Sequence, residues 1–147
     1  MQSLHNNIYK TARKNAGLTQ MQAAELLNVS VRSLADYETG KTIPPDDVVI
    51  AMIEVYKAPW LAYSHLQKST LIGNKYLPEI DLSDLPKAVL RLKKEIADVE
   101  KLDSEIVNIA CDGKIDKHEQ TAWGKIVKEI REAISAAYSV IFSREGA

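Results

Sequence analysis

Residues 108–119 carry oxygen ligands at some of the spacings of a calcium-binding EF-hand loop. Carboxylates occupy the fifth, ninth and twelfth positions, and a glycine occupies the sixth. The first position lacks a carboxylate, and the third is Ala110, which has no ligand atom. The alternative is a corner between two helices, in which Gly113 turns the chain and Asp116 caps the second helix with Glu119 as its capping partner. We expect the corner and no metal site.

Other residue types that could catalyse a reaction or bind a metal are sparse. His5, His65 and His118 have no ligand-like spacing, and we expect them at the surface or at a packed edge. Cys111 is the single cysteine, so an intrachain disulfide is excluded. The chain has no glycine-rich phosphate loop and no strand pattern for a self-cleaving Ser/Lys domain. We therefore expect no enzyme activity and no cofactor.

The composition is that of an ordinary folded protein, with 46% hydrophobic and 27% charged residues among 147. The formal net charge is −1, divided as +1 over residues 1–70 and −2 over residues 71–147. Neither half is basic enough to bind nucleic acid by charge alone. The longest apolar runs, such as residues 48–53, are far too short to span a membrane, and the start of the sequence has no signal-peptide pattern. We expect a cytoplasmic protein with no membrane partner.

Short helices at close intervals are predicted for residues 1–67. Thr19 followed by Gln22 predicts a capping box at the start of the second helix. Ser30 is expected to cap a third helix, and Gly40 is expected to end it. Pro44 and Pro45 precede a fourth helix, and Pro59 can start a fifth. Helical spacing predicts these inward-facing side chains: Ile8, Ala12, Ala23, Ala24, Leu26, Leu27, Leu34, Tyr37, Val49, Ile50, Ile53, Tyr56, Trp60, Leu61 and Leu66.

Residues 19–42 have the pattern of two helices joined by a three-residue turn. Such a pair needs a small residue where the helices cross, and Ala24 is so placed. It needs a residue that tolerates a positive φ in the turn, and Asn28 does. It also needs an apolar plug from the second helix, which Leu34 provides. The segment therefore predicts a helix-turn-helix.

At these positions the chain resembles the phage-repressor-like helix-turn-helix proteins, the XRE family, over about residues 6–66. The one departure is Asn28, where the family usually has glycine. The resemblance implies a five-helix, lambda-repressor-like domain and a regulator of bacterial or prophage type that binds double-stranded DNA. The matching residues are Gly17, Leu18, Thr19, Gln20, Ala24, Leu27, Val29, Ser30, Leu34, Glu38, Gly40, Lys41 and either Pro44 or Pro45.

The resemblance also implies roles for individual side chains. Arg13 corresponds to an arginine that pairs internally with the glutamate at the end of the recognition helix, here Glu38; the alternative is a surface arginine that touches phosphate. Positions that read base edges correspond to Gln20, Val31, Arg32 and Asp36. Asp36 could instead orient Arg32 or repel phosphate. Positions that reach the DNA backbone correspond to Ser30, Ser33, Thr39 and Lys41, and Lys10 and Lys14 are either flanking phosphate contacts or solvated lysines.

The C-terminal region, residues 83–147, is predicted to be a long antiparallel helical hairpin that follows a linker at residues 68–82. Ser83 or Asp84 caps the first arm, and Asp112 to Lys114 separate the two arms. The apolar residues of the first arm recur at steps of 4, 3, 4, 3, 3, 4 and 3 residues, which is close to a heptad pattern with one extra three-residue step. The predicted fold class is therefore all-α: a helix-turn-helix domain followed by a hairpin.

The apolar stripes of this hairpin have two interpretations. They could pack within the chain, or two hairpins could form a four-helix bundle in a homodimer or a higher oligomer. We favour the oligomer, because a hairpin this long exceeds what a small domain can cover. The stripe residues assigned to oligomerisation are Leu92, Ile96, Val99, Trp123, Ile130 and Ile141.

The sequence thus favours a DNA-binding transcriptional regulator, by default a repressor. The competing hypothesis is a protein-interaction module, such as an antitoxin or anti-regulator, whose hairpin captures a partner protein. Low basicity favours that second hypothesis, because DNA affinity depends on phosphate neutralisation. A continuous positive ridge formed by Gln20, Arg32 and Lys41 would favour DNA binding instead.

Overall fold

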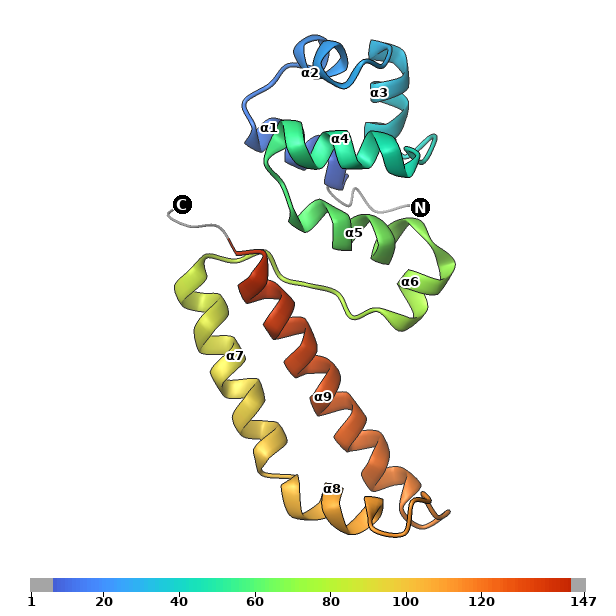
Figure 1. Cartoon of the computed structure of the whole chain (residues 1–147), viewed down its shortest axis with the longest axis vertical. Helices are drawn as coiled ribbons and strands as arrows, with labels where there is room; N and C mark the ends of the chain where they lie inside the picture. Colours follow the sequence, from blue (N-terminus) through green and yellow to red (C-terminus); the bar gives the residue numbers. More distant parts are fainter. Residues whose placement is uncertain (1–6, 144–147) are drawn as a thin grey trace. The chain divides into compact units, whose positions relative to one another are not determined.

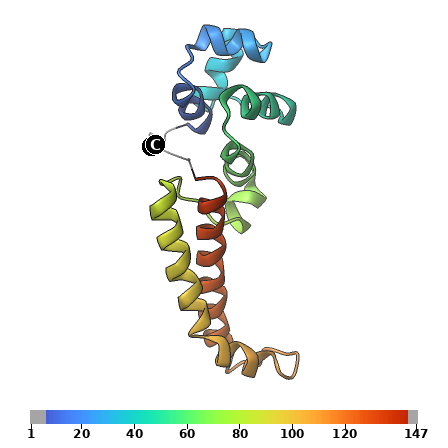
Figure 2. The same cartoon turned by 60° about the vertical axis from the view of Figure 1, so that its left-hand side comes forward.

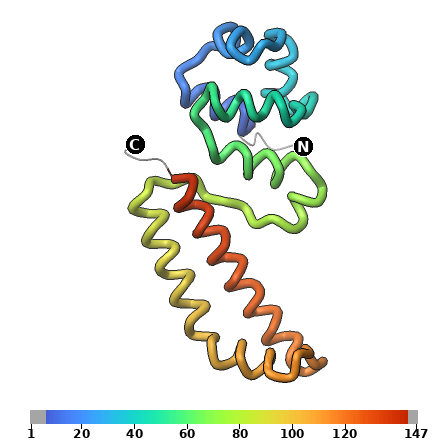
Figure 3. Tube along the Cα trace, in the orientation of Figure 1, coloured from blue at the N-terminus to red at the C-terminus, as the bar shows by residue number. Residues whose placement is uncertain are grey.

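The computed structural model describes residues 7–143, which fold into two compact units that divide between Leu77 and Pro78. Helices joined by turns and irregular segments make up these residues, with no β-strand among them, so the predicted all-α class is confirmed (Figures 1 and 3). None of the helices formed within residues 7–143 is long and apolar enough to cross a membrane.

The first unit is built from short helices whose starts follow the predicted capping residues. Thr19 and Gln22 form the predicted capping box, and the Ser30 side chain accepts a hydrogen bond from the Ser33 N–H. Asn7 caps the first helix in the same way. The bounds are α1 Ile8–Asn15, α2 Gln20–Leu27, α3 Val31–Thr39, α4 Asp46–Tyr56, α5 Trp60–Ser69 and α6 Leu71–Tyr76.

The turn between α2 and α3 is the sharp one that a helix-turn-helix requires. Asn28 adopts the left-handed conformation with φ of 53°, as predicted. The Val29 N–H then donates to the Ala24 carbonyl at 3.0 Å, which closes the turn against α2. Gly40 ends α3 with φ of 77°. A residue with a Cβ is sterically disfavoured at such angles. Glycine has no Cβ and adopts them freely, and asparagine tolerates them better than most other residues.

The core of the first unit differs from the predicted one at three apolar positions. Leu26, Ile50 and Leu66 are exposed, although helical spacing predicted them as inward. Each lies beside a better-placed buried neighbour on its helix, as Ile50 does beside Val49. Met52, which was not predicted, is completely buried. Short helices show two candidate apolar stripes, and the position of the neighbouring helices selects one.

The segment predicted as a linker, residues 68–82, contains a helix instead. α6 packs on α5, and the Thr70 side chain caps it by accepting the Gly73 N–H. A Cβ on Gly73 would lie 1.9 Å from the Leu66 carbonyl oxygen, so glycine permits this close approach. The lack of a sustained apolar period in this segment did not predict the helix, because close packing, rather than apolar periodicity, holds so short a helix. The boundary between the two units falls within the segment.

The second unit is a helical hairpin in which α7 and α9 lie side by side and antiparallel (Figures 1 and 2). Asp84 caps α7, as predicted. The residues before α7 are tied to α9, because Ser135 donates to the Glu79 carbonyl and the Asp81 N–H donates to Ser139. The bounds are α7 Leu85–Glu100, α8 Asp103–Ala110 and α9 Gln120–Ile141.

The first arm of the hairpin is broken, whereas the sequence predicted one continuous helix. α7 ends at Glu100 and α8 turns away from its axis (Figure 1). The break falls at the extra three-residue step of the apolar pattern. In a continuous helix the extra step would rotate the apolar stripe of the first arm away from α9. The turn at Leu102 changes the direction of the chain at this point.

The corner between the arms forms, but the second arm starts later than predicted. Gly113 takes a φ of 75°, and the Lys114 N–H donates to the Asp112 carboxylate. The Asp116 N–H donates to Glu119, so half of the predicted capping pair is present. Glu119 itself is the N-cap residue, and α9 begins at Gln120. The turn that follows Asp116 delays the start of the helix.

Candidate nucleic-acid interface

A buried ion pair joins α1 to α3. Nε of Arg13 donates to Oε1 of Glu38 at 2.6 Å, and Nη2 donates to Oε2 at 3.0 Å. Arg13 is 7% exposed and Glu38 is 5% exposed. The hydrogen bond to Glu38 raises the pKa of Arg13 above its ordinary value, against the opposing effect of burial. The internal pair predicted from the resemblance is therefore present, and the alternative of a surface arginine is excluded.

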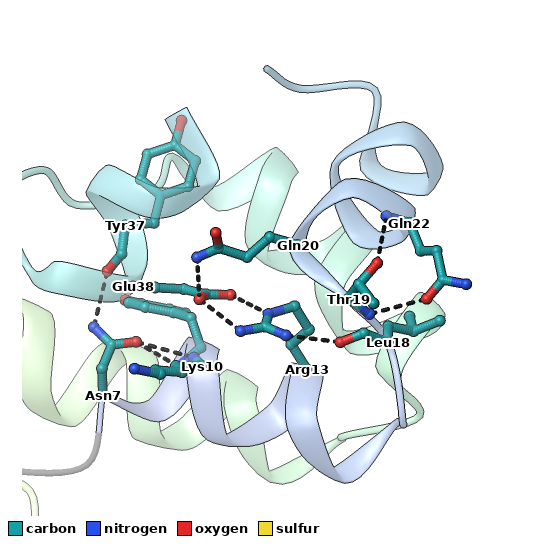
Figure 4. Close-up of polar contacts among 10 residues, drawn as sticks. Asn7, Lys10, Arg13, Leu18, Thr19, Gln20, Gln22, Tyr37 and Glu38 are labelled. Atoms are coloured by element: carbon teal, nitrogen blue, oxygen red, sulfur yellow. Dashed lines mark hydrogen bonds and ion pairs between the residues drawn. The ribbon is translucent and has the colours of Figure 1, made fainter. Parts of the chain in front are cut away.

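Neighbouring groups complete this ion pair as a network (Figure 4). Nη1 of Arg13 donates to the Leu18 carbonyl at 2.7 Å, and Nε2 of Gln20 donates to Oε2 of Glu38 at 2.9 Å. Arg13 thus contacts the segment before α2, and Glu38 contacts α2 itself. The network fixes α3 relative to both preceding helices, which is what a recognition helix needs if its outer face is to meet a ligand in one orientation.

Tyr56 is a buried phenol, as helical spacing predicted, and it lies close enough to this network to interact with its charges. Its hydroxyl is buried and has no hydrogen-bond partner among the described residues. Burial, with a smaller contribution from the negative charge of Glu38, raises the pKa of Tyr56 to about 12. Tyr56 therefore stays neutral at any ordinary pH and serves as a wall of the ion-pair site.

The outer face of α3 presents two predicted base-reading residues. Val31 and Arg32 are both exposed in its first turn. Arg32 makes no hydrogen bond or ion pair within residues 7–143. Ser30 and Ser33, beside them, bond to each other with 2.8 Å between their hydroxyl oxygens. The start of α3 therefore offers one unpaired guanidinium flanked by hydroxyl groups.

Asp36, on the next turn of α3, lies near Lys41 rather than Arg32. Its Oδ1 is 3.7 Å from Nζ of Lys41. This ion pair is loose, and the lysine side chain is largely exposed to solvent. Its carbonyl oxygen accepts the Lys41 N–H and the Thr39 hydroxyl, which ties down the end of the helix. The interpretation in which Asp36 orients Arg32 is therefore wrong in this structure. The reason is that the turn at Gly40 brings Lys41 back toward Asp36.

The remaining predicted contact residues divide between free and engaged side chains. Lys10 and Lys14 are exposed. Thr39 is exposed too, but its hydroxyl donates to the Asp36 carbonyl. Gln20 is half-buried, and its amide nitrogen is already bound to Glu38. Of the ridge expected from Gln20, Arg32 and Lys41, only Arg32 keeps an unpaired charge within the described residues. The contacts of all these residues with DNA stay predictions.

His65 is buried, whereas the sequence predicted a surface or edge position. Nδ1 of His65 lies 2.8 Å from the Tyr9 hydroxyl, and Nε2 lies 3.2 Å from Oδ1 of Asp46. The imidazole therefore links α5 to α1 and α4. His65 follows the fully buried Leu61 by four residues, and that spacing could have indicated its inward position.

Four of the six residues predicted for oligomerisation lie together in the second unit. Leu92, Ile96, Val99 and Ile130 line an open apolar groove of about 650 Å³ between the first arm and α9. Trp123 and Ile141 lie outside this groove; Trp123 is half-buried and Ile141 is exposed. The break after α7 and the late start of α9 shorten the stretch over which the two stripes face each other at the Trp123 end. Ile141 is the last residue of α9 and lies at the opposite end of the hairpin.

Comparison with known proteins supports the geometry of the first unit. A family model described as a helix-turn-helix domain matches residues 10–60, which run from α1 to the start of α5. No curated protein and no solved structure matches the chain. The match covers the turn at Asn28 and the Arg13–Glu38 pair. Residues 10–60 of this all-α chain are therefore a helix-turn-helix domain, the kind of domain with which regulators bind DNA.

Proposed function

We propose that the chain is a sequence-specific transcriptional regulator, and by default a repressor that occludes a promoter. The observation that carries the proposal is Arg32: an exposed guanidinium without a partner, at the start of a helix held in place by a buried network. In a helix-turn-helix the first residues of the second helix enter the major groove. An arginine there can donate two hydrogen bonds to O6 and N7 of a guanine.

The other contacts follow from the same docking. Val31 would meet a thymine methyl, Asp36 a cytosine amino group, and the free oxygen of the Gln20 amide a base edge or, through a water, a phosphate. Ser30, Ser33, Thr39, Lys41, Lys10 and Lys14 would contact phosphates. Three of these six phosphate-contacting side chains are neutral hydroxyls, so affinity depends on specific contacts as well as on counterion release. A shallow salt dependence is expected for that reason.

We propose that two copies of the chain associate through the apolar groove and that this homodimer binds DNA. Ile96 and Ile134 are exposed at this groove, at 45% and 42%, and exposed apolar area of this kind marks association surfaces. Two hairpins that cover each other's grooves would form a four-helix bundle. A dimer also presents two recognition helices to half-sites about 34 Å apart.

The same groove favours a second candidate function. A protein-interaction module would use it to bind an apolar helix of another protein, and the engagement of Lys41 and Gln20 within the chain is consistent with weak DNA binding. In that case the helix-turn-helix would be a scaffold or an auxiliary contact.

Selection of bound sequences from random double-stranded DNA tests the proposal. Enrichment of a two-fold symmetric site by the full chain is the expected result, and an Arg32→Ala variant should lose one base preference from that site. A Lys57→Ala variant, changed at an exposed lysine far from α3 in sequence, is the control and should select the same site. Recovery of unenriched sequences by the full chain would favour the protein-interaction module.

A further inference from the structure

Three glutamates meet between the two long helices of the second unit. Glu95 comes from α7, and Glu129 and Glu132 come from α9, one helical turn apart. One carboxylate oxygen from each lies within 4.8 Å of the other two. None of the three lines the apolar groove of the hairpin. Like charges this close repel one another, so the arrangement needs a compensating positive charge.

Glu95 shows that this compensation is incomplete within the described residues. The residue is 6% exposed, and its Oε2 atom is buried without a hydrogen-bond partner. A buried carboxylate oxygen without a donor or a cation costs free energy, and folded proteins rarely leave one so. This orphaned oxygen is an observation separate from the clustering of the three carboxylates, and it indicates a ligand.

Two lysines lie near the cluster but leave that oxygen unsatisfied. Nζ of Lys94 is 3.3 Å from Oε1 of Glu95 and is closer, at 3.0 Å, to Asp98. Nζ of Lys128 is 3.8 Å from Glu132. The lysine side chains are 67% and 70% exposed, and ion pairs of such solvated groups stabilise little. The two solvated lysines compensate the negative charge of the three carboxylates only weakly, so a cation bound directly between the carboxylates would stabilise the cluster.

We propose that Glu95, Glu129 and Glu132 bind a divalent metal ion of the oxygen-preferring class: Mg²⁺, Ca²⁺ or Mn²⁺. Oxygens bound to one such ion at about 2.0–2.6 Å can lie no more than roughly 4–5 Å apart, and the three carboxylates meet that limit. The ligand set contains no histidine or cysteine, which disfavours the softer metals. Water fills the remaining positions.

A bound ion would link α7 to α9 and stabilise the hairpin. Glu129 also lines an open hollow of about 520 Å³, so this ligand of the cluster is reached from solvent. Because the glutamates lie outside the apolar groove, the ion and a second copy of the chain can bind at the same time.

Titration of the chelator-treated full chain tests the site. MgCl₂, CaCl₂ and MnCl₂ are added separately in a calorimeter, and thermal melting is followed in parallel with NaCl at matched ionic strength as the control. At least one of the three metals should bind saturably with one ion per chain and raise the melting temperature beyond the effect of NaCl. Absence of saturable binding by all three would overturn the proposal.

Variants place the binding on these glutamates. Glu95→Gln removes the buried ligand and should weaken binding by roughly tenfold or more, since even changes outside the direct ligands cost about that much. Glu105→Gln, at an exposed glutamate of α8, is the matched control and should bind as the unchanged chain does. Glu129→Gln provides the same measurement if Glu95→Gln fails to fold. Unchanged binding by Glu95→Gln, or by Glu129→Gln in its place, would refute the site.

Discussion

Arg13 and Glu38 lie 25 residues apart in sequence and bind each other through two hydrogen bonds, 2.6 Å and 3.0 Å long. The pair is buried, and its unused groups are satisfied by the Leu18 carbonyl and the Gln20 amide. A buried pair with all its partners in place is a junction between helices rather than a surface contact. The orientation of the outer face of α3 therefore depends on Arg13 and Glu38, which do not belong to that face.

Replacing Arg13 by alanine should destabilise the first unit without removing a DNA contact. The change leaves the Glu38 carboxylate buried without its partner, which costs about 3–5 kcal/mol. Chemical denaturation in the absence of DNA measures this loss. Lys14→Ala, at the exposed neighbouring position, is the control and should change stability by no more than about 0.5 kcal/mol. Equal stability of the two variants would show that the pair contributes nothing.

Arg32→Ala and Lys41→Ala should affect DNA binding in different ways. Arg32→Ala should cost about 1–3 kcal/mol on the selected site and little on a scrambled duplex, because the guanidinium reads a base. Lys41→Ala should weaken both duplexes alike and lower the salt dependence, because the ammonium contacts phosphate. Fluorescence anisotropy on the two duplexes measures both effects. Equal losses on the two duplexes for Arg32→Ala would contradict base reading.

The hairpin groove should control the oligomeric state. The full chain is expected to sediment as a dimer or a larger species at micromolar concentration, and Ile96→Asp with Ile130→Asp should make it a monomer, because a carboxylate cannot be buried in the apolar contact. Leu90→Asp is the control, since Leu90 is exposed on α7 but does not line the groove. A monomeric unchanged chain would require withdrawal of the dimer.

The stability of the first unit should fall at high pH. The pKa of Tyr56 is raised to about 12 from an ordinary value of 10.0, so between these values the folded chain holds a proton that the unfolded chain has released. The stabilisation is therefore complete below pH 10 and is lost as the pH rises toward 12, by roughly 2–3 kcal/mol.

Tyr56→Phe tests the assignment of this pH dependence. The variant should be as stable as the unchanged chain at pH 7, because the Tyr56 hydroxyl has no partner among the described residues. Urea unfolding between pH 9 and pH 12 should show a shallower loss of stability for the variant. Parallel curves for the two proteins would show that Tyr56 is not the group responsible.

Local backbone chemistry was predictable from the sequence by itself. Thr19 and Gln22 form their capping box, Ser30 caps α3, and Asn28 takes the left-handed conformation, as expected. Each of these features is decided by groups within a few residues of one another, so no knowledge of the tertiary structure is needed. The Arg13–Glu38 pair was predicted too, but only from the resemblance to known repressors.

Tertiary packing decided the rest. Helical spacing predicted Ile50 as an inward-facing residue of α4, but the neighbouring helices bury Met52 and leave Ile50 exposed. The Gln20 amide was assigned to DNA, but Glu38 lies close enough to take it. The cluster around Glu95 was not visible in sequence, since its members are 34 and 37 residues away along the chain. The physical reason is common to all of these: helical periodicity gives the direction of a side chain around its own axis, and only the packed neighbours determine what it meets.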